Sequence, residues 1–206
     1  MKENKEFDLW SDGYGAAIHL LNDKDEYPVA GYANLLNEVY KMVRNSDAKK
    51  LLDVGFGTGI LTKKLYHDGY EISGMDMSKQ IIETGREDMP KANLVCCDYA
   101  MGMPLDFIND EFDMIISTYA FHHLDHIEKI DLMEDMYRHL KDGGKLVIGD
   151  LAFDSMKSLK NFRNANKEKW LYDQMYMVFD DVKNEYPDAT WQQISKCAGI
   201  VVITKE

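Results

Sequence analysis

The stretch Leu52-Asp53-Val54-Gly55-Phe56-Gly57-Thr58-Gly59 contains three glycines directly after a short apolar run. The run, residues 50–54, is typical of a buried strand, and Leu61 and Leu65 indicate a following helix that stops near Gly69. Ligands of α/β sheets bind at such strand-to-helix junctions, and glycine lets the backbone approach them because it has no Cβ. The stretch therefore predicts a ligand-binding loop, although three glycines alone are equally consistent with a structural turn.

Strand and helix patterns alternate around this loop. Apolar residues at helical spacing follow Pro28, which suits the first turn of a helix, and Ser78 suits the N-cap of another. Further strands are expected at 70–75, 93–97, 112–117 and 145–149, and a helix through Ile130, Met133, Tyr137 and Leu140 precedes a turn at 142–144. Alternation of this kind predicts a doubly wound parallel α/β sheet. Residues 155–184 indicate one or two helices, and 190–194 and 199–204 indicate a terminal antiparallel hairpin.

Length and composition favour one soluble domain. The chain has 206 residues, of which 45% are hydrophobic and 29% charged, and a chain of this size forms a core without disulfide or metal staples. No apolar run predicts a membrane span, and residues 1–6 lack the apolar region of a signal peptide. Three cysteines are too few for a disulfide framework, which points to the cytoplasm. A net charge of −12 disfavours a nucleic-acid partner.

Two acidic residues end the next two predicted strands. Asp76 follows Gly55 by 76 − 55 = 21 positions, close to the roughly 20-residue spacing of the ribose-binding acid in nucleotide-binding βαβ units. Its alternative role is to cap the next helix, for which Ser78 competes. Asp98 ends the third strand, where it could accept a hydrogen bond from an adenine amine. A nucleoside ligand is therefore expected across the strand ends.

The glycine spacing separates two classes of ligand. The dinucleotide fingerprint is G-x-G-x-x-G/A, whereas this chain has G-x-G-x-G with Ile60 in the last fingerprint place. No G-x-x-x-x-G-K-[ST] motif of a P-loop occurs. The loop therefore departs from both kinds of phosphate-binding loop.

Together these motifs resemble the class I S-adenosylmethionine-dependent methyltransferases. The resemblance covers residues 30–153 and rests on 53–59, Asp76, Asp98, 112–117 and 140–146, in the family's order. The N-terminal extension with Phe7, Trp10 and Tyr14, together with residues 119–124, resembles a subgroup of small, poorly characterised bacterial members. The resemblance to the class I family implies a Rossmann-like seven-stranded sheet of order 3-2-1-4-5-7-6, with strand 7 antiparallel and helices on both faces. The pattern along the chain divides this single domain into an N-terminal extension or lid (1–27), a cofactor-binding core (28–153), and a helical insertion with the hairpin (154–206).

The resemblance also implies roles for individual residues. Gly55 and Gly57 would pass beneath the methionine part of S-adenosylmethionine, and Asp53 would hold the loop. Asp76 would bind the ribose hydroxyls, and Asp98 the adenine amine. Met77 would pack on adenine near Tyr99, and Ser117 would line the route to the methyl group. Phe56 stands where many relatives carry a different small or cyclic residue. The implied reaction is in-line methyl transfer to a small-molecule acceptor, with S-adenosylhomocysteine as product.

His122 and His123 follow the fourth strand at the ligand-binding edge and are the candidate catalytic residues. A hydroxyl or ammonium acceptor needs a base, and histidine titrates near neutral pH. The alternative is a polar helix start packed beside the pocket. His122 and His126 are four residues apart and would share a helix face, but no H-E-x-x-H motif or third ligand is evident, so no metal site is expected.

Aromatic residues in the N-terminal extension are candidate cofactor contacts. Tyr14 and Trp10 could close over the cofactor, since an aromatic face attracts a sulfonium by roughly 0.5–2 kcal/mol. They could equally pin the terminus to the core.

Other features favour plain structural interpretations. The row Lys157, Lys160, Arg163 and Lys167 predicts a solvated helix face rather than a site for an anionic acceptor, and Cys96 and Cys97 are expected in the core. Acceptor specificity is expected in residues 1–27, 119–126 and 153–185, which suit a small or amphipathic acceptor. Two other functions stay open: a cofactor-binding protein without catalysis, and a nicotinamide-dependent oxidoreductase, which the glycine spacing disfavours.

Overall fold

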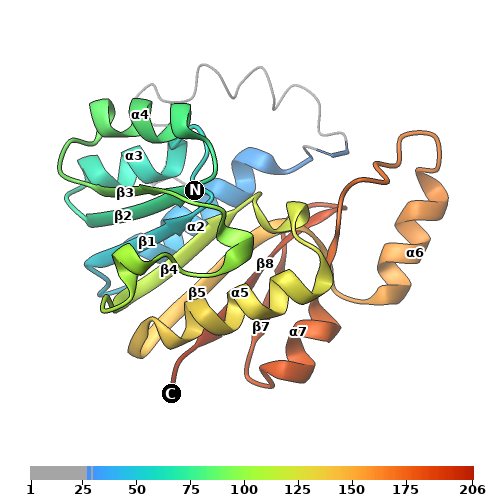
Figure 1. Ribbon diagram of the computed structural model, residues 1–206. Coiled ribbons are helices and arrows are strands. Elements are labelled where there is room, and N and C mark those ends of the chain that lie inside the picture. The colour runs from blue at the N-terminus through green and yellow to red at the C-terminus, as the bar shows by residue number, and fades with distance from the viewer. Residues whose placement is uncertain (1–26, 29) are drawn as a thin grey trace, which may run out of the picture.

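The computed structural model describes residues 27–28 and 30–206 (Figure 1). The helices are α2 (Tyr32–Arg44), α3 (Ile60–His67), α4 (Lys79–Asp88), α5 (His126–Arg138), α6 (Met156–Ala165) and α7 (Phe179–Glu185). The strands are β1 (Lys50–Val54), β2 (Glu71–Asp76), β3 (Asn93–Cys96), β4 (Phe112–Thr118), β5 (Leu140–Phe153), β6 (Met177–Val178), β7 (Thr190–Gln193) and β8 (Ala198–Thr204). Three single 3-10 turns are η2 (Tyr99–Met101), η3 (Leu105–Phe107) and η4 (Phe121–His123).

The sheet has the order β3-β2-β1-β4-β5-β8-β7, and the short strand β6 pairs with β5 outside this path. The first five strands are parallel, while β8 runs antiparallel to both β5 and β7. Strands β8 and β7 correspond to strands 7 and 6 of the expected order, which is therefore confirmed. The short strand β6 is an addition to it. The order reverses between β1 and β4, and ligands of doubly wound sheets bind beside such a switch point.

Alternating side chains of the central strands feed two cores, one on each face of the sheet. Leu51, Met114 and Ile116 pack with α2 and α3, whereas Leu52 and Ile115 pack with α5 and α7. The two layers of helices are visible in Figure 1. Burial on both faces explains the nearly continuous apolar runs of these strands. It also fixes the strand ends from which the loops of the site project.

Local signals set the helix boundaries. Ser78 accepts a hydrogen bond from Ile81 N–H, which confirms the predicted N-cap of α4. Asp125 and Glu128 form a capping box that starts α5 directly after η4. The helix predicted from Pro28 begins instead at Tyr32, because Gly31 adopts a left-handed φ of 80° and Pro28 lies in a turn.

The remaining differences from prediction lie in loops and at edges. Leu140 belongs to β5 rather than to a helix, and residues 142–144 lie within β5 where its register against β4 shifts. The prediction that Cys96 and Cys97 are core residues is wrong: Cys96 is exposed and Cys97 half-buried, because β3 is the edge strand. In the part of the chain that the structure describes, no helix is long and apolar enough to cross a membrane.

Candidate functional site

The glycine loop joins β1 to α3 at the carboxyl edge of the sheet. Gly55 and Gly57 adopt left-handed φ angles of 70° and 53°, which favour glycine. A Cβ on Gly55 would lie 2.5 Å from Ala120 Cβ, so this glycine is needed for close packing against the residues after β4. A Cβ on Gly57 would meet no atom within 4 Å, so open space lies next to its backbone.

Asp76 joins the loop to the end of β2. Its Oδ2 accepts a 3.0 Å hydrogen bond from Gly57 N–H, and its Oδ1 accepts a 2.9 Å bond from Ser78 N–H. The side chain is 8% exposed. Each carboxylate oxygen has a second lone-pair site, so both could still accept from a pair of vicinal hydroxyls.

Asp53 is the most deeply buried acid of the loop region, at 2% exposed. Its Oδ2 accepts a 2.6 Å hydrogen bond from Thr62 Oγ1, while its Oδ1 has no hydrogen-bond partner among the described residues. Burial raises the pKa of Asp53 to about 7, the Thr62 bond opposes that rise, and the charge of Asp76 adds to it. A buried, unpartnered carboxylate oxygen is a costly feature that a cationic ligand would relieve.

Two of the predicted contact residues are held elsewhere by their side chains. The ring of Phe56 packs with Ile82, Met89 and Leu94 beside α4, so only its backbone lies in the loop. The Ser117 hydroxyl is 1% exposed and donates a 2.8 Å hydrogen bond to the Val54 carbonyl, which ties β4 to β1. Both residues shape the loop, and a cofactor contact through either side chain has no support in this geometry.

The predicted adenine contacts differ in exposure. Met77 is 55% exposed although it is apolar and directly follows Asp76. Asp98 is exposed and accepts a 3.0 Å bond from Ala100 N–H as the N-cap of η2. Tyr99 is buried against Gly55, and burial, followed by the charges of nearby acids, raises its pKa to about 12. Met77 and Asp98 are thus accessible to a ligand, while Tyr99 supports the loop from within.

His122 makes a side-chain hydrogen bond to a buried acid that the sequence interpretation missed. Its Nδ1 lies 2.7 Å from Asp150 Oδ1, and Asp150 is 1% exposed near the carboxyl end of β5. β5 continues beyond the last paired residue of β4, so Asp150 stands beside the residues that follow β4. The signal was available, because Asp150 directly follows the predicted strand 145–149, as Asp76 and Asp98 follow theirs.

The other histidines are placed differently. His123 is exposed, and its ring lies against that of His122 with the centroids 4.1 Å apart and the planes tilted by 50°. Partial burial, followed by the neighbouring His122, lowers the pKa of His123. The expectation that His122 and His126 share a helix face is wrong, since His122 lies in η4 and His126 begins α5. The described residues contain no group of three metal-ligating side chains.

Tyr119, directly after β4, is a second residue without an assigned role in the sequence interpretation. It has a φ of 53°, which is unusual for a bulky residue and occurs most often at functional sites. Its hydroxyl is buried without a partner in the described chain, and its ring packs 4.8 Å from that of Tyr32. Burial and then the charge of Asp53 raise the pKa of Tyr32.

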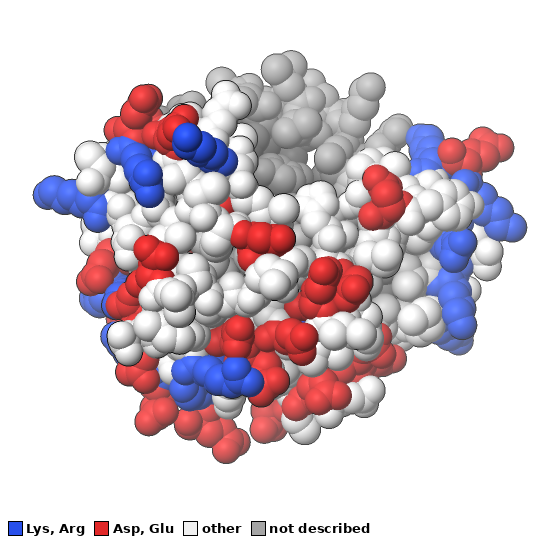
Figure 2. Space-filling model, viewed as in Figure 1, with Lys and Arg blue, Asp and Glu red and all other residues white. Residues whose placement is uncertain are grey.

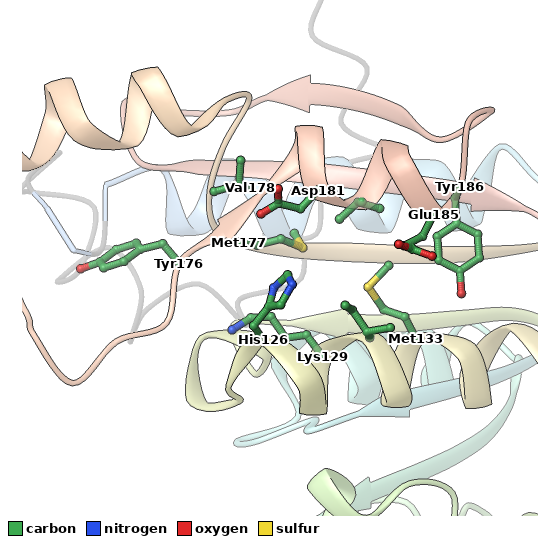
Figure 3. Close-up of a pocket in the computed structure, with 11 residues that line it drawn as sticks. His126, Lys129, Met133, Tyr176, Met177, Val178, Asp181, Glu185 and Tyr186 are labelled. Carbon is green, nitrogen blue, oxygen red and sulfur yellow. The ribbon is translucent and has the colours of Figure 1, made fainter.

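A separate hollow lies between α5 and α7 (Figure 3). His126, Lys129 and Met133 line it from α5, and Asp181 and Glu185 from α7. None of the lining residues belongs to the glycine loop or to the acids at the ends of β2 and β3. Lys129 donates to the carbonyls of Leu124 and Met175, and burial lowers its pKa to about 8. This lysine therefore fastens the loop after η4 rather than facing the glycine loop.

Surface charge agrees with the sequence interpretation. Acidic side chains are spread over the face shown in Figure 2, and basic ones gather at the edge where α6 lies. Lys157, Lys160, Arg163 and Lys167 are exposed, as expected for a solvated face, but Lys167 lies beyond the end of α6 and so does not share the predicted helix. The Arg163 guanidinium lies over the rings of Trp170 and Tyr172. Tyr14 and Trp10 lie outside the described residues.

Comparison with known proteins identifies the family. A model of the methyltransferase domain matches residues 51–144. An uncharacterized methyltransferase of Anoxybacillus flavithermus is 30% identical over 87% of this chain and 80% of the relative. The chain belongs to the methyltransferase family. A second such methyltransferase, from Alkaliphilus oremlandii, is 27% identical over 89% of this chain and 81% of its own.

A solved methyltransferase structure shares the fold. Magnesium protoporphyrin IX methyltransferase from Synechocystis, crystallised with bound S-adenosylhomocysteine, aligns with a TM-score of 0.67 over 98% of this chain and 95% of its own, at 13% identity. This likeness shows the Rossmann-like methyltransferase architecture.

Proposed function

We propose that this methyltransferase binds S-adenosylmethionine across the ends of β1, β2 and β3 and transfers its methyl group to a small-molecule acceptor. One observation carries the proposal. The unpartnered Asp53 Oδ1 lies in β1, Gly57 with its open side lies in the loop that follows, and Gly57 N–H is bonded to the Asp76 carboxylate at the end of β2. Asp53 offers a carboxylate oxygen for the cationic end of a ligand, and Gly57 leaves room for the ligand's middle part. Asp76 offers two acceptor oxygens for a diol.

Each part of that cofactor would have a candidate residue in this chain. Asp53 would accept from the amino-acid end, whose positive charge stabilises the ionised carboxylate. Asp76 would accept from both ribose hydroxyls. The exposed Met77 would cover an adenine face, and Asp98 would accept from its amine. Gly55 and Gly57 supply backbone without side chains beneath the methionine part.

When bound, the cofactor supplies a methyl group on a positively charged sulfur that is already a good leaving group. The protein therefore has to align the acceptor and exclude water. Residues that follow β4 would do this, and we propose His122 as the base for acceptors that carry a proton. His123, more exposed and with a lowered pKa, would orient the acceptor.

Calorimetric titration tests the proposal. We expect saturable binding of S-adenosylhomocysteine and no binding of NADH, because the loop lacks the dinucleotide fingerprint. Methyl transfer from labelled S-adenosylmethionine to a broad set of small acceptors then separates catalysis from binding. Tight binding of NADH with none of S-adenosylhomocysteine would refute the proposal.

A further inference from the structure

We propose that the acceptor reacts through a group that carries a proton at neutral pH, namely a hydroxyl, thiol or amine. We further propose that Asp150 is the positioning residue that holds His122 to remove this proton. The inference rests on the proposed methyl transfer and specifies its substrate class. The proposed acceptor class excludes carboxylates, phosphates and phosphonates.

Asp150 is held rigidly at the end of β5. Its Oδ1 accepts from His122 Nδ1 at 2.7 Å and from Leu151 N–H at 2.6 Å, and its Oδ2 accepts from His122 N–H at 3.2 Å. The same aspartate thus fixes both the ring and the backbone of His122. A second bond fixes the backbone from the other side, since Met175 N–H donates to the His122 carbonyl at 2.9 Å.

This geometry determines which ring nitrogen of His122 is basic. A carboxylate only accepts, so Nδ1 carries the hydrogen in the neutral ring and Nε2 keeps its lone pair. Nε2 has no hydrogen-bond partner among the described residues, and the ring is 12% exposed. An imidazole held by a buried carboxylate with its other nitrogen free is the arrangement of a general base.

The buried charged residues favour an acceptor that is not an anion. The buried acids of the described chain are Asp53, Asp76 and Asp150, and its buried bases are Lys64 and Lys129. Lys64 pairs with Asp68 on α3, and the Lys129 ammonium already donates to two carbonyls. Asp53 and Asp76 are assigned to the cofactor, so an acceptor anion beside His122 would approach the buried Asp150 carboxylate without an uncommitted buried cation of the described chain to compensate it.

The groups around His122 come from β5, η4 and α5 and from the loops after β4 and α6. Asp150 faces it from β5, His123 from η4 and Tyr119 from the end of β4, while Lys129 of α5 and Asp173 act electrostatically on the adjacent His123. In this group only Asp150 is hydrogen-bonded to the His122 ring.

In the proposed step the acceptor loses a proton to His122 and gains the methyl group. His122 Nε2 takes the proton from the acceptor's O–H, S–H or N–H group, and the freed electron pair forms the bond to the methyl carbon. The methyl–sulfur bond breaks and its electron pair stays on the sulfur of S-adenosylhomocysteine. The histidinium, stabilised by Asp150, then releases its proton to solvent.

The experiment compares wild type, Asp150→Asn and His122→Gln, with the exposed His126→Gln as the matched control. All four are first titrated with S-adenosylhomocysteine, and we expect equal affinities. Failure of wild type to bind would refute the proposed function itself, independently of this inference. Labelled methyl transfer is then measured between pH 5.5 and 9 with phenol, thiophenol and benzylamine, and with benzoate and phenylphosphonate as matched anions.

We expect transfer to the first three probes only, about 10²–10⁴-fold slower in His122→Gln. In Asp150→Asn the acid limb of the pH profile should move to lower pH, because the histidinium loses its negative neighbour. Transfer to benzoate or phenylphosphonate, or an unmoved profile in Asp150→Asn, would overturn the inference. If no probe reacts, ¹⁵N-histidine NMR decides: an Nδ1–H tautomer of His122 supports it, and an Nε2–H tautomer contradicts it.

Discussion

Gly57 N–H donates a 3.0 Å hydrogen bond to Asp76 Oδ2 and so joins the glycine loop to the end of β2. The bond fixes the carboxylate and the open side of the loop in one arrangement before any ligand arrives. A preformed site loses less entropy on binding than a mobile one. Because of this bond, a substitution at Gly57 or Asp76 is expected to alter the position of the other residue.

Replacing Gly57 tests whether the open space beside the loop is a ligand position. Gly57→Ala should weaken S-adenosylhomocysteine binding at least tenfold, because a methyl group would occupy that space. Gly69→Ala is the matched control, since Gly69 also has positive φ and open surroundings but lies after α3. Both variants should lose about 1 kcal/mol of stability through backbone strain. Equal affinities of the two variants in calorimetry would argue against the assignment.

Asp53 gives the apo protein a specific pH dependence. Burial raises its pKa from the ordinary 3.8 to about 7, so the folded state keeps a proton that the unfolded state releases. The free energy of unfolding should therefore fall as pH rises from about 4 to about 7, by at most about 4 kcal/mol from this group. Urea unfolding of Asp53→Asn should lack that component, whereas the exposed Asp131→Asn should retain it. An identical slope in Asp53→Asn and wild type would contradict the prediction.

Tyr119→Phe separates function from stability. The Tyr119 hydroxyl is buried without a partner in the described residues, so removing it should leave the protein equally stable or up to about 1 kcal/mol more stable. If the hydroxyl instead serves a bound ligand, the variant should lose methyl transfer or ligand affinity. Thermal unfolding and calorimetry check the two effects, and a clear loss of stability would show that the hydroxyl has a structural partner.

The sheet was predictable because burial on both faces leaves strong marks in the sequence. Leu51 and Leu52 point to opposite cores, so the strand appears as a continuous apolar run. The start of α2 was not predictable in the same way: Pro28 suits a first helical turn, but the turn geometry at Gly31 delays the helix. Cys96 was misplaced because edge position depends on strand order, which apolar pattern does not report.

The site was predictable where one loop and one spacing define it, as for Asp53, Gly57 and Asp76. The Ser117 hydroxyl donates a hydrogen bond to the Val54 carbonyl on the neighbouring strand. No local sequence pattern indicates this contact. The His122–Asp150 contact joins residues 28 positions apart and depends on β5 extending past β4. Contacts of this kind arise from topology rather than from motif spacing.

The most direct test of the account is the affinity of Asp76→Ala for S-adenosylhomocysteine, measured by calorimetry against wild type. The variant should bind at least tenfold more weakly, because hydrogen bonds to a charged acceptor contribute roughly 1.5–3 kcal/mol each. Asp131→Asn should bind like wild type. Unchanged affinity in Asp76→Ala would show that the sugar is not held at the end of β2 and would contradict the nucleoside site itself.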